Sequence, residues 1–307
     1  MPLGANKAAL MGASNTGVVT IDAFTSSDTW TCPAGVTSAE ILVVGGGGGG
    51  AGAYGGGGGA GGIVHDTDYT VVPSTVYDIT VGGGGTGGQT NNADNGSDTV
   101  WNVNAEGSGL AFTAKGGAGS VGYSYPNMQE GKNGGNGSGT CGSDANGFSG
   151  GSSTQANFAG ATSYGNDGGV GDDAAEDYAG AGGGAGGNGG NGGVSQAGDG
   201  GVGVLFSTFV AHGTDSSNVD STGANGGWFG GGGAGGQEAW LSAASNAGGL
   251  AGVGGGGLGY RGSSTDGNGG SGHTNTGGGG AGSCCSNYTA ADAGNGGSGI
   301  VLIKYLL

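Results

Sequence analysis

The chain has 307 residues, of which 91 are glycine and 4 are proline, and its formal net charge is −17 at pH 7. Collagen is excluded, because its triple helix requires glycine at every third position together with abundant proline. The negative charge repels nucleic-acid phosphates and anionic lipids, so we expect no nucleic-acid partner.

Residues 1–16 are small and mostly uncharged, and they lack the long apolar run of a secretory signal peptide. No stretch of 18 consecutive apolar residues follows them, so we expect no insertion into a membrane. We predict that residues 1–16 form an arm that docks onto a partner protein. The candidate docking residues of this arm are Leu3, Lys7, Leu10 and Met11.

Residues 17 to about 119 carry the pattern of β-strands. The segments 39–44 (AEILVV) and 75–81 (TVYDITV) are rich in β-branched residues, and a Pro-Ser turn signal precedes the second. Residues 299–305 (GIVLIKY) predict a further strand at the other end of the chain. We therefore expect residues 17–119 and 298–305 to form one β part, in which strands from both ends of the chain share a sheet system.

Residues 116–297 have low complexity and repeat Gly-Gly-X units, for example GGNGGNGGV at 186–194. A repeat of three matches the roughly three residues per turn of a polyproline II helix. With glycine at two of three positions, such helices can pack backbone against backbone and hydrogen-bond to their neighbours. We predict an all-β domain over residues 17–307, in which sandwich-like sheets carry a bundle of polyglycine II helices and almost no α-helix.

Less repetitive inserts interrupt the glycine repeats and carry aromatic residues. If the repeats are rods, the inserts are loops at rod ends, where a rigid scaffold commonly displays recognition residues. Aromatic rings offer flat contact faces with little entropy to lose, so they are the candidate receptor contacts. These candidates are Tyr164, Trp228, Trp240 and Tyr288. The alternative interpretation is that such rings close the ends and edges of the bundle.

The sequence matches the glycine spacing of a dinucleotide-binding motif, but not the structure that this motif requires. The strand 41–44 is followed by Gly45, Gly47 and Gly50, but that motif requires a helix after its glycines to hold the pyrophosphate. The five glycines after Tyr54 are incompatible with such a helix. We expect no enzyme activity, no catalytic residue and no cofactor.

Clusters of acidic residues are the only candidates for a metal ion, and one of them is a loop-like insert. Its members are Asp172, Asp173, Glu176 and Asp177. Asp94, Gly96 and Asp98 loosely echo a calcium loop but lack its spacing and its terminal Glu. We therefore predict a solvated acidic loop and no metal, with structural calcium as the alternative.

The four cysteines lack the spacing of a zinc site or a redox motif. We expect thiols that are free or only partly paired. The alternative is a disulfide from Cys32 or Cys141 to the adjacent pair Cys284 and Cys285, which would clip the two ends of the chain together.

Three segments resemble the flanking motifs of a family of glycine-rich domains found in bacteriophage tail fibres, tip adhesins and other virion proteins. They are residues 28–44 (DTWTCPAGVTSAEILVV), 75–85 (TVYDITVGGGG) and 296–305 (GGSGIVLIKY). The resemblance covers about residues 20–305. It implies a β-sandwich that supports polyglycine II helices, and a virion-surface or receptor-binding role without catalytic residues.

We therefore hypothesise a non-enzymatic bacteriophage virion protein, which displays loops on a polyglycine scaffold for attachment to the host. Its expected partners are other virion proteins, a host surface glycan or protein, and further copies of itself, with a trimer as one form. Its expected location is the virion surface. The alternative is a capsid or tube decoration protein, or a filament subunit, that binds no receptor.

Overall fold

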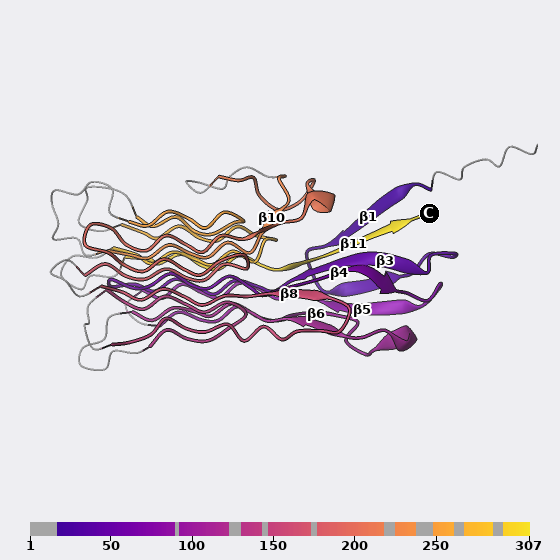
Figure 1. The fold of residues 1–307 in the computed structure, drawn as a ribbon, viewed down its shortest axis with the longest axis horizontal. Helices are drawn as coiled ribbons and strands as arrows, with labels where there is room; N and C mark the ends of the chain where they lie inside the picture. Colours follow the sequence, from indigo (N-terminus) through magenta and orange to yellow (C-terminus); the bar gives the residue numbers. More distant parts are fainter. Residues whose placement is uncertain are drawn as a thin grey trace, which may run out of the picture.

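The computed structural model describes residues 17–89, 92–122, 130–142, 147–172, 177–217, 225–237, 248–260, 267–284 and 291–307. The molecule is elongated, with β-strands gathered at one end and glycine-rich segments running lengthwise to the other (Figure 1). We call these the sandwich end and the distal end. The described residues form no α-helix, and their helical segments are the short 3₁₀ helices η1 and η2. Neither of these is long and apolar enough to cross a membrane.

The strands form three antiparallel sheets, which confirms the predicted mostly-β fold. A five-stranded sheet has the order β1-β11-β3-β4-β8, a four-stranded sheet the order β2-β5-β6-β7, and β9 pairs with β10. The elements are β1 (Val19–Phe24), β2 (Asp28–Thr31), β3 (Ser38–Val44), β4 (Ile63–Thr70), β5 (Val76–Thr80), β6 (Thr99–Trp101), η1 (Glu106–Ser108), β7 (Phe112–Ala114), β8 (Thr162–Tyr164), β9 (Val204–Leu205), η2 (Ser207–Phe209), β10 (Trp228–Phe229) and β11 (Ile300–Leu306).

The last strand of the chain lies inside the main sheet, between the first and third strands. β11 pairs with β1 from Val19↔Leu306 to Phe24↔Val301, and with β3 from Ile300↔Val44 to Lys304↔Glu40. The expectation that strands from both ends of the chain share one sheet system is therefore confirmed. Three short strands, β8, β9 and β10, lie in the region where we had expected only rods and loops.

The apolar run of β3 is continuous because both of its faces are covered. Ile41 and Val43 point into a core between the two large sheets, where the rings of Tyr77 and Trp101 stack with centroids 5.1 Å apart. Successive side chains of a strand point to opposite faces. Leu42 and Val44 therefore meet a second core, to which the η2 and β10 segments contribute rings. Those rings are Phe206, Phe209 and Phe229.

The glycine-rich segments hydrogen-bond with a period of three. Within residues 45–51, backbone amides donate in turn to three different neighbours over 2.9–3.2 Å. Gly45, Gly48 and Ala51 donate to residues 56–62, Gly46 and Gly49 to 94–97, and Gly47 and Gly50 to 294–297. Carbonyls of the same run accept from residues 85–88, 117–120 and 280–283. A period of three is that of the polyglycine II helix, so these bonds favour the predicted packing.

Close backbone approach explains why glycine dominates this bundle. A Cβ added at Gly48 would lie 2.1 Å from the Ala118 carbonyl oxygen, and one at Gly50 would lie 2.0 Å from that of Ala281. Real side chains essentially never come so near to backbone. The interior of the glycine bundle therefore excludes any side chain at these positions.

Asparagine side chains bond the backbone at the edges of the bundle, also with a period of three. The Asp167 and Val170 amides donate to the Oδ1 atoms of Asn188 and Asn191 over 3.2 and 2.9 Å. The Gly119 amide donates to Asn95 Oδ1 over 2.8 Å. At these edges, the side chain of the X residue in the Gly-Gly-X repeat thus supplies the hydrogen-bond acceptor that the backbone of a further glycine segment would otherwise supply.

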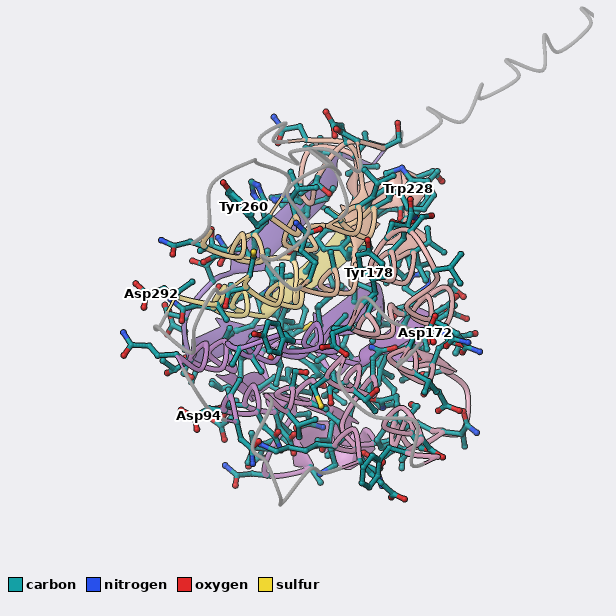
Figure 2. The ribbon with its side chains drawn as sticks, turned by 90° about the vertical axis from the view of Figure 1, so that its left-hand side faces the viewer. Asp94, Asp172, Tyr178, Trp228, Tyr260 and Asp292 are labelled. Atoms are coloured by element: carbon teal, nitrogen blue, oxygen red, sulfur yellow. The ribbon has the colours of Figure 1, made fainter. Side chains whose placement is uncertain are left out.

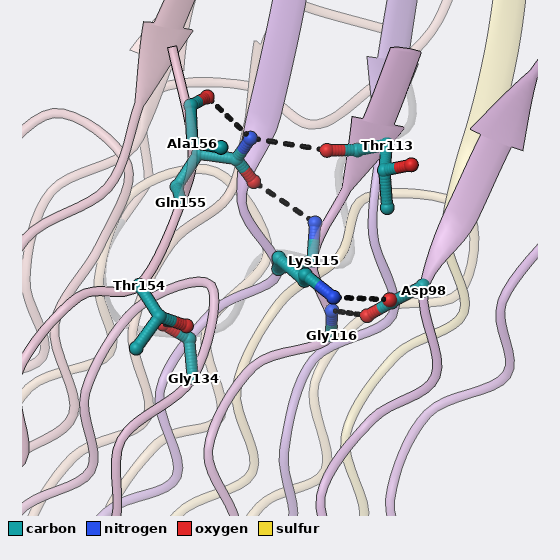
Figure 3. Close-up of polar contacts among 8 residues, drawn as sticks. All are labelled: Asp98, Thr113, Lys115, Gly116, Gly134, Thr154, Gln155 and Ala156. Carbon is teal, nitrogen blue, oxygen red and sulfur yellow. Dashed lines mark hydrogen bonds and ion pairs between the residues drawn. The ribbon is translucent and has the colours of Figure 1, made fainter. Parts of the chain in front are cut away.

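Gln155 joins the sandwich to the glycine bundle (Figure 3). Its Oε1 accepts from the Lys115 amide over 2.9 Å, and its Nε2 donates to the carbonyl oxygens of Thr113 and Ala156 over 3.1 and 3.0 Å. Lys115 Nζ also reaches Asp98 Oδ2 at 2.9 Å. The end of β7 is therefore bonded by one side chain where it passes into a glycine segment.

Candidate functional site

The distal end is organised around a central turn at residues 51–54. The amides of Gly88, Gly142 and Ser283 donate to carbonyls of this turn and its approach, those of Gly50, Tyr54 and Ala51, over 2.9, 2.9 and 3.1 Å. The turn itself is buried by these neighbours, and Ala53 and Tyr54 adopt positive φ angles of 54° and 56°. Such angles are disfavoured for residues other than glycine, so the surrounding segments must hold the turn in place.

A second turn at the distal end, residues 194–196, is exposed. Val194 is 77 % exposed, which is the largest exposed fraction among the large apolar side chains of the described residues. Before the turn, the Gly192 amide donates a hydrogen bond to the Val170 carbonyl oxygen. After the turn, Ala197 packs on Tyr178. An analysis restricted to aromatic residues does not find this exposed apolar side chain.

The described surface of the distal end is acidic and polar. Figure 2 looks onto this end, where Asp94, Asp172 and Asp292 point outward around the rim. Gln89 Nε2 donates to Asp292 Oδ1 over 2.7 Å. Lys132 Nζ donates to the Ala93 carbonyl oxygen over 2.8 Å, and burial lowers the pKa of this lysine. Within the described residues, no three His, Cys, Asp or Glu side chains gather to hold a metal ion.

Two aromatic residues at the distal end act as covers of the bundle. Tyr178 is 1 % exposed and packs against Ala197. The Tyr260 ring lies on the backbone of Gly267, where an added Cβ would fall 2.1 Å from a ring carbon. For these two residues the structure agrees with the alternative interpretation, in which rings close the ends of the bundle.

The two candidate receptor contacts that the structure describes, Tyr164 and Trp228, do not lie at the distal end. Tyr164 lies in β8 at the sandwich end, half-buried, with its ring centroid 5.8 Å from that of Phe206. Trp228 lies in β10, half-buried, and its backbone pairs with Thr214 and Leu205. Both residues belong to strands, which keeps them near the sheets. Trp240 and Tyr288 lie outside the described residues.

The docking candidates Leu3, Lys7, Leu10 and Met11 also lie outside the described residues. The first described residues nevertheless have a defined place. Val18 and Leu307 exchange backbone hydrogen bonds of 3.0 Å in each direction, so the described chain begins and ends at the sandwich end.

Cys32 is a buried thiol at the sandwich end. Its Sγ donates to the Val36 carbonyl oxygen over 3.3 Å, and burial raises its pKa. Cys284 lies beside the distal turn instead, because its neighbour Ser283 bonds Ala51. The alternative of a disulfide from Cys32 to the pair at 284 and 285 is therefore wrong. Cys285 lies outside the described residues.

A partly buried ionic cluster lies on the main sheet. Glu40 accepts from His65 Nε2 at 3.0 Å, Lys304 Nζ at 2.9 Å and Thr208 Oγ1 at 2.7 Å. Burial raises the pKa of Glu40, but the three hydrogen bonds together with the Lys304 charge outweigh burial, and the net pKa is lowered. The cluster joins β3, β4 and β11 to η2, so its role is to hold the layers together.

A family model described as a glycine-rich domain matches residues 22–306, which is nearly the whole chain. Among curated proteins, none matches this sequence.

Proposed function

The chain belongs to the glycine-rich domain family, and we propose that it is a non-enzymatic surface protein of a bacteriophage virion, such as a tail fibre or tip adhesin. The sandwich end docks onto other virion proteins, with residues 1–16 as the docking arm and a homo-oligomer, for example a trimer, as the working form. The distal end attaches to a glycan or protein on the host surface.

The observation that carries this proposal is the two-ended layout of the molecule. Val18 and Leu307 are paired at the sandwich end, while the glycine segments turn at the opposite end (Figure 1). A partner that binds the first or the last described residues of the chain therefore leaves the distal end accessible.

Exposed apolar residues support docking at the sandwich end. Val18, Val19, Leu306 and Leu307 lie on the paired ends of β1 and β11, and each is more than half exposed. Apolar side chains gathered on a surface are typical of protein contacts. An acidic, polar distal end offers no comparable apolar patch among its described residues.

Labelling two exposed valines at opposite ends tests the proposal. Val194→Cys lies in the distal turn and Val103→Cys lies after β6 at the sandwich end, where the valines are 77 % and 46 % exposed. Each is made in a Cys285→Ser background, and the described cysteines Cys32, Cys141 and Cys284 are buried. After coupling to a bulky maleimide polymer, we expect the Val194→Cys protein to lose binding to host cells while the Val103→Cys protein retains it.

Equal binding by the two labelled proteins would contradict the proposal that the distal end contacts the host cell. If even unlabelled protein does not bind host cells, the decoration or filament alternative is favoured. The aromatic candidates are tested in the same assay. We expect Trp240→Ala and Tyr288→Ala to reduce binding without changing the melting temperature.

A further inference from the structure

β1 lies at an edge of the five-stranded sheet, and its outer side is open (Figure 1). Val18 and Leu307 exchange backbone hydrogen bonds, and opposite residues of an antiparallel pair alternate between bonded and non-bonded pairs. The N–H and C=O groups of Val19, Ile21 and Ala23 therefore point away from β11. Among the described residues, none bonds these outward groups.

β1 lacks the features that normally block an open strand edge. It contains no proline, glycine or lysine, and its register with β11 is unbroken along its six residues. At the other edges of the two large sheets the strands are shorter, with three residues in β8, four in β2 and three in β7. Gln155 also bonds the Thr113 carbonyl of β7, and the Thr29 amide of β2 donates to Asp28 Oδ1 over 2.8 Å. β1 is thus the edge best suited to pair with a further strand.

The open edge of β1 carries no charge. Its one charged residue, Asp22, faces the core between the two large sheets, because its Oδ2 accepts from Trp30 Nε1 and Tyr305 Oη, each over 2.9 Å. The chain has a net charge of −17, so two copies repel each other wherever acidic surfaces meet. At the β1 edge, this repulsion is absent from the contact itself.

The sequence of β1 is complementary to itself in one antiparallel register, in which the two copies of Ile21 lie opposite each other. All outward backbone groups of both strands then fall in hydrogen-bonded pairs. Apolar residues face apolar residues, and a threonine faces the aspartate. The opposed pairs are Val18 with Phe24, Val19 with Ala23, Thr20 with Asp22, and Ile21 with Ile21. A register centred on Asp22 would instead set two carboxylates opposite each other, which is destabilising.

A second copy of β1 suits this edge better than the segment that precedes β1 in the sequence. Residues 1–16 contain Thr16 but no other β-branched residue and no aromatic residue, and they include Pro2 and two glycines. Such a composition disfavours a strand. The residues of β1 are mostly β-branched or aromatic, so they favour one.

We propose that two copies of this chain associate through their β1 edges, with a two-fold axis at Ile21, so that the five-stranded sheets of both copies form one continuous sheet. Because the paired strands are antiparallel and β1 runs broadly along the molecule, the two glycine bundles extend in opposite directions (Figure 1). Both distal ends therefore stay accessible. The two-fold dimer differs from the trimer given above as an example, and its formation does not depend on binding to host cells.

Ala23→Pro and Thr31→Pro form a matched pair of variants that tests the dimer. Each places a proline at an exposed residue of an edge strand, where the amide points away from the neighbouring strand and proline is tolerated. In sedimentation equilibrium, we expect the full chain and Thr31→Pro to have twice the mass of one chain. Ala23→Pro should have the mass of one chain, because it loses a donor to the second copy. Equal masses for the two variants, or a wild-type chain that is monomeric up to its solubility limit, would overturn the proposal.

A cysteine cross-link tests the register without relying on the proline variants. Opposite residues of a hydrogen-bonded pair lie about 5.5 Å apart at Cα, a separation that a disulfide can span. In a Cys285→Ser background, we expect Ile21→Cys chains to form disulfide-linked dimers with oxidised glutathione. Val19→Cys should not, because two Val19 residues are offset by four positions, about 13 Å along the strand. Equal cross-linking of the two variants, or none of Ile21→Cys, would contradict this register.

Hydrogen exchange distinguishes a second copy from a cover supplied by the chain itself. We expect the amides of Val19, Ile21 and Ala23 to exchange slowly in the dimer and rapidly when dilution gives monomers. Slow exchange of these amides in the monomer would mean that the chain covers its own edge, and it would overturn the proposal.

Discussion

Individual glycines in this molecule have different structural roles, although their neighbours in the sequence are alike. Gly48 lies between segments, and a Cβ there would meet the Ala118 carbonyl oxygen at 2.1 Å. Gly83 has an equally repetitive neighbourhood in sequence, yet a Cβ there would meet nothing within 4 Å. The first glycine is required by close approach, whereas the second is not.

The pair Gly48→Ala and Gly83→Ala tests this difference. Overpacking costs about 1–3 kcal/mol or more of the free energy of unfolding, and we expect at least that loss for Gly48→Ala. At Gly83 the added methyl reduces the entropy of the unfolded chain, so we expect a gain of about 0.4–1 kcal/mol. Denaturant melts of the two variants measure both values, and similar losses would contradict the close packing at residue 48.

At the scale of elements, side chains complete hydrogen bonds where a strand or a glycine segment lacks a neighbour. Gln155 bonds both the Thr113 carbonyl and the Lys115 amide, as a neighbouring strand would. Asn188 and Asn191 accept from a neighbouring segment at the spacing of its three-residue period. These polar residues therefore set where each sheet and the bundle end.

Removing the Gln155 side chain is expected to weaken the junction. Gln155→Ala leaves the Lys115 amide and the Thr113 carbonyl without their partner, which we expect to cost about 1–3 kcal/mol of the free energy of unfolding. Asn157→Ala is the control, because Asn157 is exposed and should change stability by about 0.5 kcal/mol or less. Equal effects of the two variants in thermal or denaturant unfolding would show that the junction does not depend on Gln155.

At the scale of the whole molecule, Glu40 links layers that are far apart in sequence. Its carboxylate bonds Lys304 of β11, His65 of β4 and Thr208 of η2. Its lowered pKa means that the folded state favours the charged form. This contribution to stability is present above the unfolded pKa of about 4.5 and is lost as the pH falls through the lower folded value.

Acid unfolding of Glu40→Gln tests this link. At pH 7 we expect a loss of about 1.5–3 kcal/mol of the free energy of unfolding, because hydrogen bonds to a charged group are removed. Below pH 4.5 the wild type should lose stability more steeply than the variant. Glu106→Gln, at an exposed acid, should keep the wild-type slope. An unchanged slope in Glu40→Gln would mean that the cluster does not contribute to acid stability.

The sequence predicted those parts in which side chains carry the signal. The apolar runs of β3 and β11 predicted buried strands, since their continuous pattern arises from cover on both faces. The Gly-Gly-X period predicted backbone packing with a repeat of three. The sequence was less informative about the candidate site. Nothing in it distinguishes Tyr164 and Trp228, which lie in strands, from aromatic residues in loops. Val194 was missed because only aromatic residues were considered as contacts.

What the sequence by itself determined was the class of the molecule: strands at both ends of the chain and a glycine bundle between them. Only the tertiary structure decided which glycine segment lies beside which, and that Tyr164 and Trp228 stay with the sheets. The physical reason is that glycine has no side chain with which to specify a partner. The order of strands in the sheets positions each glycine segment, and that order brings together residues as distant as Gly50 and Gly294.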